Sequence, residues 1–244
     1  MREIVFEITE NAPIAAGVYR MSLRGDARDI TRPGQFVNIR LDGFFLRRPI
    51  SVCDRSENSL TLIYKILGRG TEAMSRMRAG ETLDVLSGLG NGYDTAASGM
   101  RPLLIGGGVG VPPLYMLAKE LLAQGKAVRA VLGFNSACDV FYAEEFAALG
   151  CEVAVTTVDG SFGRRGFVTD ALPEDATYFY ACGPEAMLRA VYRATAISGE
   201  FSFEERMGCG FGACMGCTCK TVSGSKRICR DGPVLKREEI LWQN

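Results

Sequence analysis

Four cysteines near the C-terminus have a spacing that suits metal-cluster chemistry. Cys209, Cys214 and Cys217 follow the pattern C-x4-C-x2-C, and Cys229 comes after eleven intervening residues. This spacing is typical of plant-type iron–sulfur ligation, in which thiolates hold the iron atoms. The sequence therefore predicts an iron–sulfur cluster with these four cysteines as its metal ligands.

The stretch that carries the cysteines, residues 207–220, is rich in glycine. Glycine allows positive φ and lets the backbone approach a cofactor closely. Backbone N–H groups that point at the sulfides then tune the reduction potential. We expect a tight loop around the cluster, shaped by Gly208, Gly210, Gly212 and Gly216.

Two other uses of the cysteines are weighed against the cluster. A four-cysteine zinc site usually pairs one C-x2-C with a second short knuckle, whereas this sequence contains a single C-x2-C. A disulfide framework is disfavoured because the cysteine count, nine, is odd and the chain resembles no short secreted scaffold. The spare Cys219 is interpreted as a small, buried apolar residue on an outgoing strand.

Composition excludes several classes of function. The 28 basic and 28 acidic residues balance, which disfavours nucleic acid as a partner. The sequence has no histidine, which removes His-based triads, Rieske ligation and His-containing zinc sites. We expect no signal peptide and no membrane partner, because no window approaches the ~18 apolar residues of a membrane helix. Since the cluster needs reduced thiols, we expect a cytoplasmic protein.

The first part of the chain, to about residue 97, is expected to form a small β-barrel or sandwich. Apolar alternation bounded by turn residues predicts strands at 2–8, 17–23, 35–41, 59–66 and 82–86. A short helix is expected at 71–77, with Thr71 as its N-cap.

Two segments of this part contain groups that suit an anionic ligand. Arg47–Ser51 places guanidinium groups and a hydroxyl around Pro49, and arginine pairs well with a pyrophosphate. Gly68–Thr71 leads into the short helix, whose N–H groups attract anions. Taken singly, the first is equally typical of a solvated strand edge and the second of a turn with a cap.

From residue 100 the pattern changes to alternating strands and helices. Strands are expected at 102–105, 128–132, 152–156 and 178–181, and helices at 111–123, 143–149 and 185–196. This order predicts a doubly wound parallel sheet, with ligands at the carboxyl ends of its strands.

Two turns at strand ends are candidates for nucleotide binding. Gly106–Gly110 ends a strand and opens a helix as a pyrophosphate loop does, although it does not fit G-x-G-x-x-G. Cys182–Pro184 repeats the strand–turn–helix arrangement. A plain tight turn remains open for the first, and Cys182 is interpreted on its own as a packing residue.

The order of these signals resembles the ferredoxin–NADP reductase superfamily over about the first 200 residues. Within it, residues 207–219 and 228–233 look like the electron-transfer subunits of type B dihydroorotate dehydrogenase, and the similarity then covers essentially the whole chain. The resemblance implies an FAD-binding antiparallel β-barrel at 1–98, a doubly wound parallel α/β NAD-binding domain at 99–199 and a small [2Fe–2S] module at 200–244.

The resemblance also implies which residues hold each cofactor. FAD would be held by Arg48, Pro49, Ile50, Ser51, Ile63, Tyr64, Lys65, Gly70 and Thr71. The nicotinamide nucleotide would be bordered by Gly107, Gly108, Gly110, Cys182, Gly183 and Pro184. The [2Fe–2S] cluster would be ligated by Cys209, Cys214, Cys217 and Cys229. No general base is required at the flavin, so no catalytic residue is expected.

The implied function is electron relay in pyrimidine biosynthesis. Nicotinamide exchanges a hydride, an iron–sulfur cluster passes single electrons, and a flavin does both. A partner subunit would oxidise dihydroorotate on FMN and the electrons would reach NAD⁺ through the cluster and FAD, in a heterotetramer with two of each subunit. The apolar Phe211 and Met215 beside the cluster are expected to dock this partner.

Two alternatives stay open, together with the choice of nucleotide. Hydrogenase-associated and ferredoxin:NADP transhydrogenase subunits share the architecture, but some look to use Asp-Gly-Thr-Gly where this chain has Cys-Gly-Phe-Gly-Ala-Cys. A zinc-stabilised binding module is the non-catalytic alternative. We predict NAD over NADP because no cationic pair follows the second strand at Asn135, although Arg164 and Arg165 lie in a later expected loop.

Overall fold

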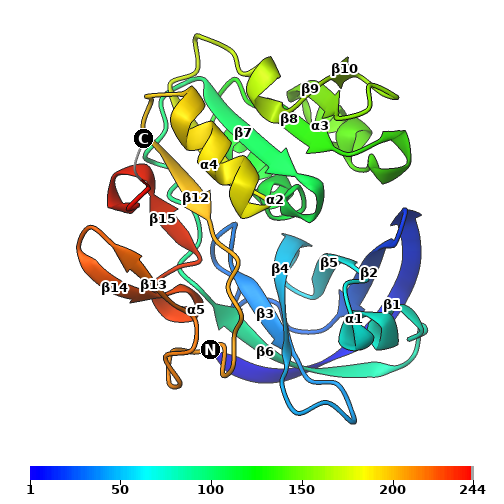
Figure 1. The fold of residues 1–244 in the computed structure, drawn as a ribbon. Helices are drawn as coiled ribbons and strands as arrows, with labels where there is room; N and C mark the ends of the chain where they lie inside the picture. The colour runs from blue at the N-terminus through cyan, green and yellow to red at the C-terminus, as the bar shows by residue number, and fades with distance from the viewer. Residues whose placement is uncertain (243–244) are drawn as a thin grey trace.

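The computed structural model describes residues 1–242 and places a barrel, a mainly parallel sheet and a small C-terminal module against one another (Figure 1). The predicted fold class is confirmed. Among these residues no helix is long and apolar enough to cross a bilayer. The domain limits at 98 and 199 stay a prediction.

The N-terminal barrel is closed and antiparallel, with the strand order β1-β2-β5-β4-β3-β6. Its strands are β1 (Arg2–Ala15), β2 (Val18–Arg24), β3 (Phe36–Ile39), β4 (Arg48–Arg55), β5 (Ser59–Lys65) and β6 (Thr82–Leu89). Alternate apolar residues fill the interior, as the period-two pattern requires. Sequence alternation did not identify β4 as a full strand, because it carries polar and charged residues at both of its ends.

The short barrel helix α1 (Arg69–Ser75) begins earlier than predicted. Gly68 is the N-cap residue, so the prediction that Thr71 caps the helix is wrong. Thr71 lies within the first turn, where its Oγ1 accepts hydrogen bonds from the N–H groups of Leu67 at 3.0 Å and Gly68 at 3.3 Å. Its side chain therefore fixes the approach to the helix from inside the turn.

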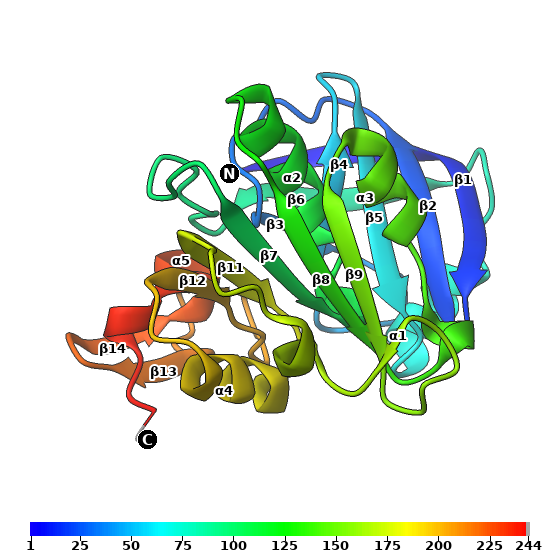
Figure 2. The same ribbon diagram turned by 90° about the horizontal axis from the view of Figure 1, so that it is seen from above.

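The α/β part is built on a sheet with the order β10-β9-β8-β7-β11-β12-β15. Its strands are β7 (Pro102–Gly107), β8 (Arg129–Phe134), β9 (Glu152–Thr157), β10 (Arg164–Arg165), β11 (Tyr178–Cys182), β12 (Gly199–Ser202) and β15 (Val234–Lys236). Its helices are α2 (Pro113–Ala123), α3 (Ala143–Leu149) and α4 (Glu185–Ala194). Figure 2 shows α2 and α3 on the face toward the barrel and α4 on the opposite face.

The C-terminal module is joined to the sheet by its own last strand. It contains the hairpin β13 (Thr218–Thr221) and β14 (Gly224–Arg227), followed by the single turn α5 (Ile228–Asp231). The next strand, β15, pairs antiparallel with β12, with Phe201 opposite Leu235. The cluster-binding stretch is therefore held between the barrel and the edge of the nucleotide sheet.

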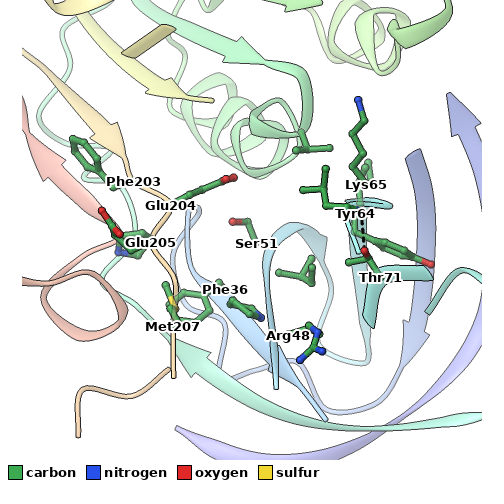
Figure 3. A pocket seen from close by; sticks show the side chains of 16 residues that line it. Phe36, Arg48, Ser51, Tyr64, Lys65, Thr71, Phe203, Glu204, Glu205 and Met207 are labelled. Carbon is green, nitrogen blue, oxygen red and sulfur yellow. Dashed lines mark hydrogen bonds between the residues drawn. The ribbon is translucent and has the colours of Figure 1, made fainter. Parts of the chain in front are cut away.

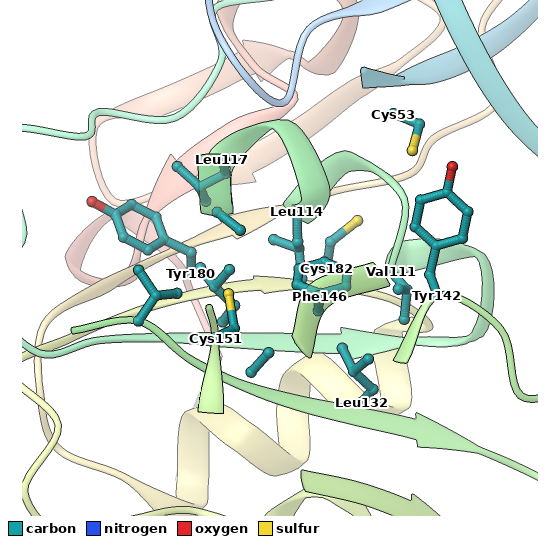
Figure 4. Packing of buried hydrophobic residues seen from close by; sticks show 14 of the residues in the cluster. Cys53, Val111, Leu114, Leu117, Leu132, Tyr142, Phe146, Cys151, Tyr180 and Cys182 are labelled. Carbon is teal, nitrogen blue, oxygen red and sulfur yellow. The ribbon is translucent and has the colours of Figure 1, made fainter. Parts of the chain in front are cut away.

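Two contacts fasten the barrel strand β4 to the helices of the α/β part. Lys119 of α2 donates hydrogen bonds to both carboxylate oxygens of Asp54 at 2.8 and 2.7 Å. The hydroxyl of Tyr142 points toward the buried side chain of Cys53, and the two residues pack in one apolar cluster (Figure 4). Tyr142 has a positive φ of 65°, which is uncommon for a residue other than glycine. These contacts fix the helix that follows the Gly106–Gly110 turn relative to the strand that begins with Arg48.

Candidate cofactor sites

A cavity between the barrel, the Gly106–Gly110 turn and the C-terminal module is the candidate flavin site, here called the flavin pocket (Figure 3). The predicted FAD residues that line it are Arg48, Pro49, Ile50, Ser51, Ile63, Tyr64, Lys65 and Thr71. They come from the start of β4, the end of β5 and the start of α1, three neighbouring parts of the barrel wall. The structure thus brings this predicted set together.

Gly70, the remaining residue of the set, makes room for an arginine. A Cβ on Gly70 would lie 2.1 Å from Nε of Arg48, so any side chain there would displace the guanidinium. Arg48 also stacks over the ring of Phe44, with 4.7 Å between its Cζ and the ring centroid. The cation is therefore held at the pocket wall by close packing.

Tyr64 contributes to the pocket in a different way from its neighbours. Its ring stacks against Tyr19, and its hydroxyl donates a hydrogen bond to Oδ1 of Asn11 at 2.9 Å. Burial raises its pKa to about 12, with the Asn11 contact acting in the opposite direction. The Tyr64 hydroxyl is thus neutral and already bonded, and this residue supports the wall more than it offers a reactive group.

No sequence signal identified the segment that closes the other side of the flavin pocket. Phe203, Glu204, Glu205 and Met207, which connect β12 to the first cluster cysteine, all line the cavity (Figure 3). Further lining residues are Phe36, Leu67, Val109 and Pro233. The segment is irregular and has no periodicity, so only its position after β12 could have pointed to it.

Glu204 lies close to the predicted nucleotide turn. The side chain of Glu204 is exposed and lines both the flavin pocket and a second cavity beside Gly183 and Pro184. Burial raises the pKa of Cys182 to about 12, and the negative charge of Glu204 acts in the same direction. A carboxyl and a neutral thiol therefore sit together where the flavin pocket meets the end of β11.

The two predicted nucleotide turns touch one another at the carboxyl ends of β7 and β11. These strands are parallel neighbours, with Gly106 opposite Cys182. A Cβ on Gly110 would lie 2.2 Å from the carbonyl oxygen of Cys182, so only glycine permits the approach. The structure therefore brings together Gly107, Gly108, Gly110, Cys182, Gly183 and Pro184. Cys182 is also a packing residue, since its side chain is buried.

An acidic group lies beside the end of the second strand, where the sequence predicted none. Asp159 follows β9, and its N–H donates to the carbonyl oxygen of Asn135 at 3.2 Å. Its carboxylate accepts hydrogen bonds from the hydroxyl and N–H of Ser161, which lower its pKa. Arg164 and Arg165 form the short exposed strand β10 and not a loop, because they pair with the end of β9.

The four predicted cluster ligands converge as two pairs of thiols. Sγ of Cys209 accepts from the N–H groups of Ala213 at 3.2 Å and Cys214 at 3.4 Å, and Sγ of Cys214 accepts from Cys209 N–H at 3.4 Å. In the second pair, Sγ of Cys217 accepts from Cys229 N–H at 3.4 Å. Backbone N–H groups thus already point at sulfur, as cluster sites require.

The chemistry of these thiols fits a metal cluster. Burial tends to raise the pKa of Cys209, but hydrogen bonds from the backbone of Cys214 and Phe211 lower it to about 6, which favours the thiolate that binds metal. Burial, followed by the nearby Cys217 thiol, raises the pKa of Cys229 to about 12. Across residues 1–242 no three Cys, Asp or Glu side chains are grouped tightly enough to hold a single ion.

Cys219, the spare cysteine, lies on β13 and is half-buried. It packs against the small apolar cluster that contains Phe36, Cys217 and Cys229. Burial raises its pKa. This agrees with its interpretation as a packing residue, although its exposure is greater than expected.

Comparison with known proteins bears directly on these sites. Residues 204–241 match the model described as the iron–sulfur cluster binding domain of dihydroorotate dehydrogenase B, and residues 104–193 match an oxidoreductase NAD-binding domain. A protein of Geobacillus sp. (strain WCH70), named dihydroorotate dehydrogenase B (NAD(+)), electron transfer subunit, is 44% identical over 99% of both chains. One of the same name from Fusobacterium nucleatum is 44% identical over 96% of both.

The chain belongs to this family of electron transfer subunits. The predicted family is thereby confirmed, and with it the prediction that the chain is an oxidoreductase subunit of dihydroorotate dehydrogenase B.

Solved structures extend the comparison to the fold. The NADH-dependent reduced ferredoxin-NADP oxidoreductase, studied for flavin-based electron bifurcation, superposes with a TM-score of 0.88 at 32% identity and covers 97% of this chain and 90% of its own. A flavohem-like FAD/NAD binding domain from Vibrio cholerae has a TM-score of 0.69 at 24% identity, over 79% of this chain and 92% of its own, which shows the shared fold. These comparisons confirm the three predicted cofactors, which are an iron–sulfur cluster, FAD and NAD.

Proposed function

We propose that this electron transfer subunit links dihydroorotate oxidation on a partner subunit to NAD⁺ through a [2Fe–2S] cluster and FAD. The observation that carries the proposal is the position of the flavin pocket. It is lined by the barrel, by Val109 within the first nucleotide turn and by Met207 before the first cluster cysteine. A group bound there is next to both other sites.

The chain's own residues would bind and orient FAD. Arg48 and Thr71 would hold the phosphates, with Gly70 keeping the guanidinium in place, while Ile63 to Lys65 would lie along the flavin and its ribityl chain. When bound, FAD exchanges a hydride with nicotinamide and single electrons with an iron–sulfur cluster. Ser51 and Glu204 are further polar side chains that line the pocket (Figure 3).

The turns at the ends of β7 and β11 would bind the nicotinamide nucleotide. Nothing lies within 4 Å of a Cβ on Gly108, which would leave the backbone there open to a pyrophosphate. Gly107 and Gly110 pack against the second turn, whose residues Cys182 to Pro184 would border the nicotinamide. Asp159 supports NAD over NADP, because a carboxylate accepts a hydrogen bond from a ribose hydroxyl and repels a 2′-phosphate.

The partner would be the FMN-containing catalytic subunit, in a heterotetramer with two copies of each chain. Phe211 and Met215, on the loop that holds the cluster ligands, are 44% and 54% exposed and would dock it. Exposed apolar side chains beside a redox centre suit a surface that another subunit covers. Because the cluster needs reduced thiols, the complex would act in the cytosol.

Spectroscopy of the anaerobically purified chain, co-expressed with the catalytic subunit, tests the route. Flavin bands, a broad iron–sulfur shoulder and a rhombic EPR signal that appears with either NADH or dihydroorotate are expected. A colourless protein that carries zinc would overturn the proposal.

A pair of matched variants tests the docking surface. Phe211→Asp should abolish co-purification with the catalytic subunit, whereas Val222→Asp, on the β13–β14 hairpin, should leave it intact. Co-purification of both variants would refute the docking surface.

A second candidate function is reductase activity with ferredoxin. It is favoured by the similarity to the NADH-dependent reduced ferredoxin-NADP oxidoreductase. NADH oxidation by the purified complex should be supported by orotate and not by ferredoxin. The reverse preference would replace the proposed function with this one.

A further inference from the structure

Asn38 is a buried polar residue in the middle of an apolar barrel strand. The strand β3 reads Phe-Val-Asn-Ile, and the Asn38 side chain is only 1% exposed. Its Nδ2 donates a hydrogen bond to the carbonyl oxygen of Cys209 at 3.3 Å, across 171 positions in sequence. Its Oδ1 is buried without a partner in the described part of the chain. A buried acceptor without a hydrogen bond destabilises the fold, so packing alone does not explain Asn38.

The cluster stretch is shaped to receive this amide. Gly210, next to the ligand Cys209, has a φ of 79°, and a Cβ there would lie 2.3 Å from Nδ2 of Asn38. Only glycine permits both the backbone conformation and the approach. The amide therefore makes direct contact with the backbone that carries the first cluster ligand.

The same face of β3 reaches the flavin pocket and the other ligand pair. Phe36 lies two residues before Asn38, on the same side of the strand. It lines the flavin pocket and packs in the apolar cluster that contains Cys217 and Cys229. Val37 and Ile39 point the other way, into the barrel core. One face of one short strand thus contacts both cofactor sites.

This strand is held firmly in the barrel wall. It pairs with β4 on one side and β6 on the other. Nη1 of Arg47 donates to the carbonyl oxygen of Asn38 at 3.4 Å and to the carboxylate of Asp84 at 2.8 Å. A contact from β3 to the cluster stretch consequently fixes that stretch relative to the flavin pocket.

We propose that Asn38 is a positioning residue for the iron–sulfur cluster: its amide fixes the Cys209–Gly210 backbone and adds a positive dipole end beside the cluster that stabilises the reduced form. An apolar residue of similar volume would fill the space, but it would neither hold the carbonyl of Cys209 nor supply the dipole. This inference rests on the proposed assignment of the four cysteines as cluster ligands.

The test compares Asn38→Leu with Val37→Ala in the holoprotein, by redox titration followed by EPR. Asn38→Leu should retain FAD and a full complement of iron. The midpoint potential of its cluster should fall by an amount that corresponds to at least a threefold change in the equilibrium constant for one-electron reduction. The EPR line shape should change as well. Val37→Ala loosens the same strand from its other face, so it should lower the thermal midpoint and leave the potential unchanged.

Each result decides one question. An unchanged potential and line shape in Asn38→Leu, with the cluster present, overturns the positioning role, as does an equal potential shift in Val37→Ala. If Asn38→Leu fails to assemble a cluster, Asn38→Ala is measured instead, because it removes the donor without adding volume against Gly210. A wild-type potential together with an unchanged line shape in that variant overturns the inference. Absence of a cluster from the wild-type chain refutes the ligand assignment itself.

Discussion

The cluster stretch and the flavin pocket are built in opposite ways. All four thiols lie within residues 209–229, and backbone N–H groups of the same stretch supply their hydrogen bonds. The flavin pocket is instead lined by residues from Phe36 to Pro233, which only the completed fold brings together. A local site depends on its own loop, whereas an assembled site depends on every element that meets there. The predictions below test that difference.

The largest effect is expected from Cys214→Ser. Loss of one thiolate should remove the cluster entirely, seen as loss of the iron–sulfur shoulder and of the EPR signal, because the ligand set is local. FAD content and NADH-driven reduction of an artificial two-electron acceptor should persist. Loss of FAD together with the cluster would show that the two sites do not form independently.

Gly70→Ala should produce the converse result. The new Cβ would lie 2.1 Å from Nε of Arg48 and displace the guanidinium, so we expect FAD affinity to fall about 100-fold, or ~2.7 kcal/mol, with the cluster retained. Gly68→Ala is the matched control, since nothing lies within 4 Å of its Cβ. Equal FAD dissociation constants for the two variants, from equilibrium titration, would contradict the role of Gly70.

Glu200→Gln should change the pH dependence of the assembled region. Burial raises the pKa of Glu200 to about 7, and the negative charges of Asp94 and Glu239 act in the same direction. The hydrogen bond from the backbone N–H of Asp94 and the positive charge of Lys236 act in the opposite direction. The stability contributed by the protonated carboxyl is present below pH ~4.5 and is lost as pH rises through 7.

Glutamine retains the acceptor for Asp94 N–H, at 3.0 Å in the wild type, but does not ionise. The variant should therefore gain about 2 kcal/mol relative to the wild type between pH 5 and pH 8. Thermal midpoints of the holoproteins measure this, with the exposed Glu57→Gln as control. A gain that is the same at both pH values would exclude ionisation of Glu200 as the cause.

The smallest effect is expected from Asp159→Asn. Removing the negative charge should reduce the preference for NADH over NADPH, as the ratio of kcat/KM, by about tenfold, or ~1.4 kcal/mol. Asp42→Asn, on an exposed turn, should leave the ratio unchanged. An unchanged ratio in Asp159→Asn would place nucleotide selection elsewhere, and a wild-type preference for NADPH would contradict the choice of NAD.

The difference between a local site and an assembled site also explains which residues could be predicted from the sequence. The cluster cysteines and the glycine turns were identified because their chemistry is contiguous. Glu204 and Asp159 were missed, since each acquires its neighbours only when β11 meets β12 or when β8 meets β9. The prediction that Thr71 is the N-cap was wrong, because a threonine inside the first helical turn and a threonine at the N-cap are preceded and followed by similar sequence. Asn38 gave no signal, because its partner is 171 positions away.

The strand β15 has a consequence for how the protein is made. It emerges from the ribosome roughly thirty residues after its partner β12, an interval of a few seconds at typical rates of synthesis. During that interval the barrel is complete, while the edge of the nucleotide sheet has no neighbour and exposes unpaired backbone groups. All four cysteines are translated in the same window. A chain truncated before residue 234 would therefore lack the partner of β12, and the open edge would favour aggregation.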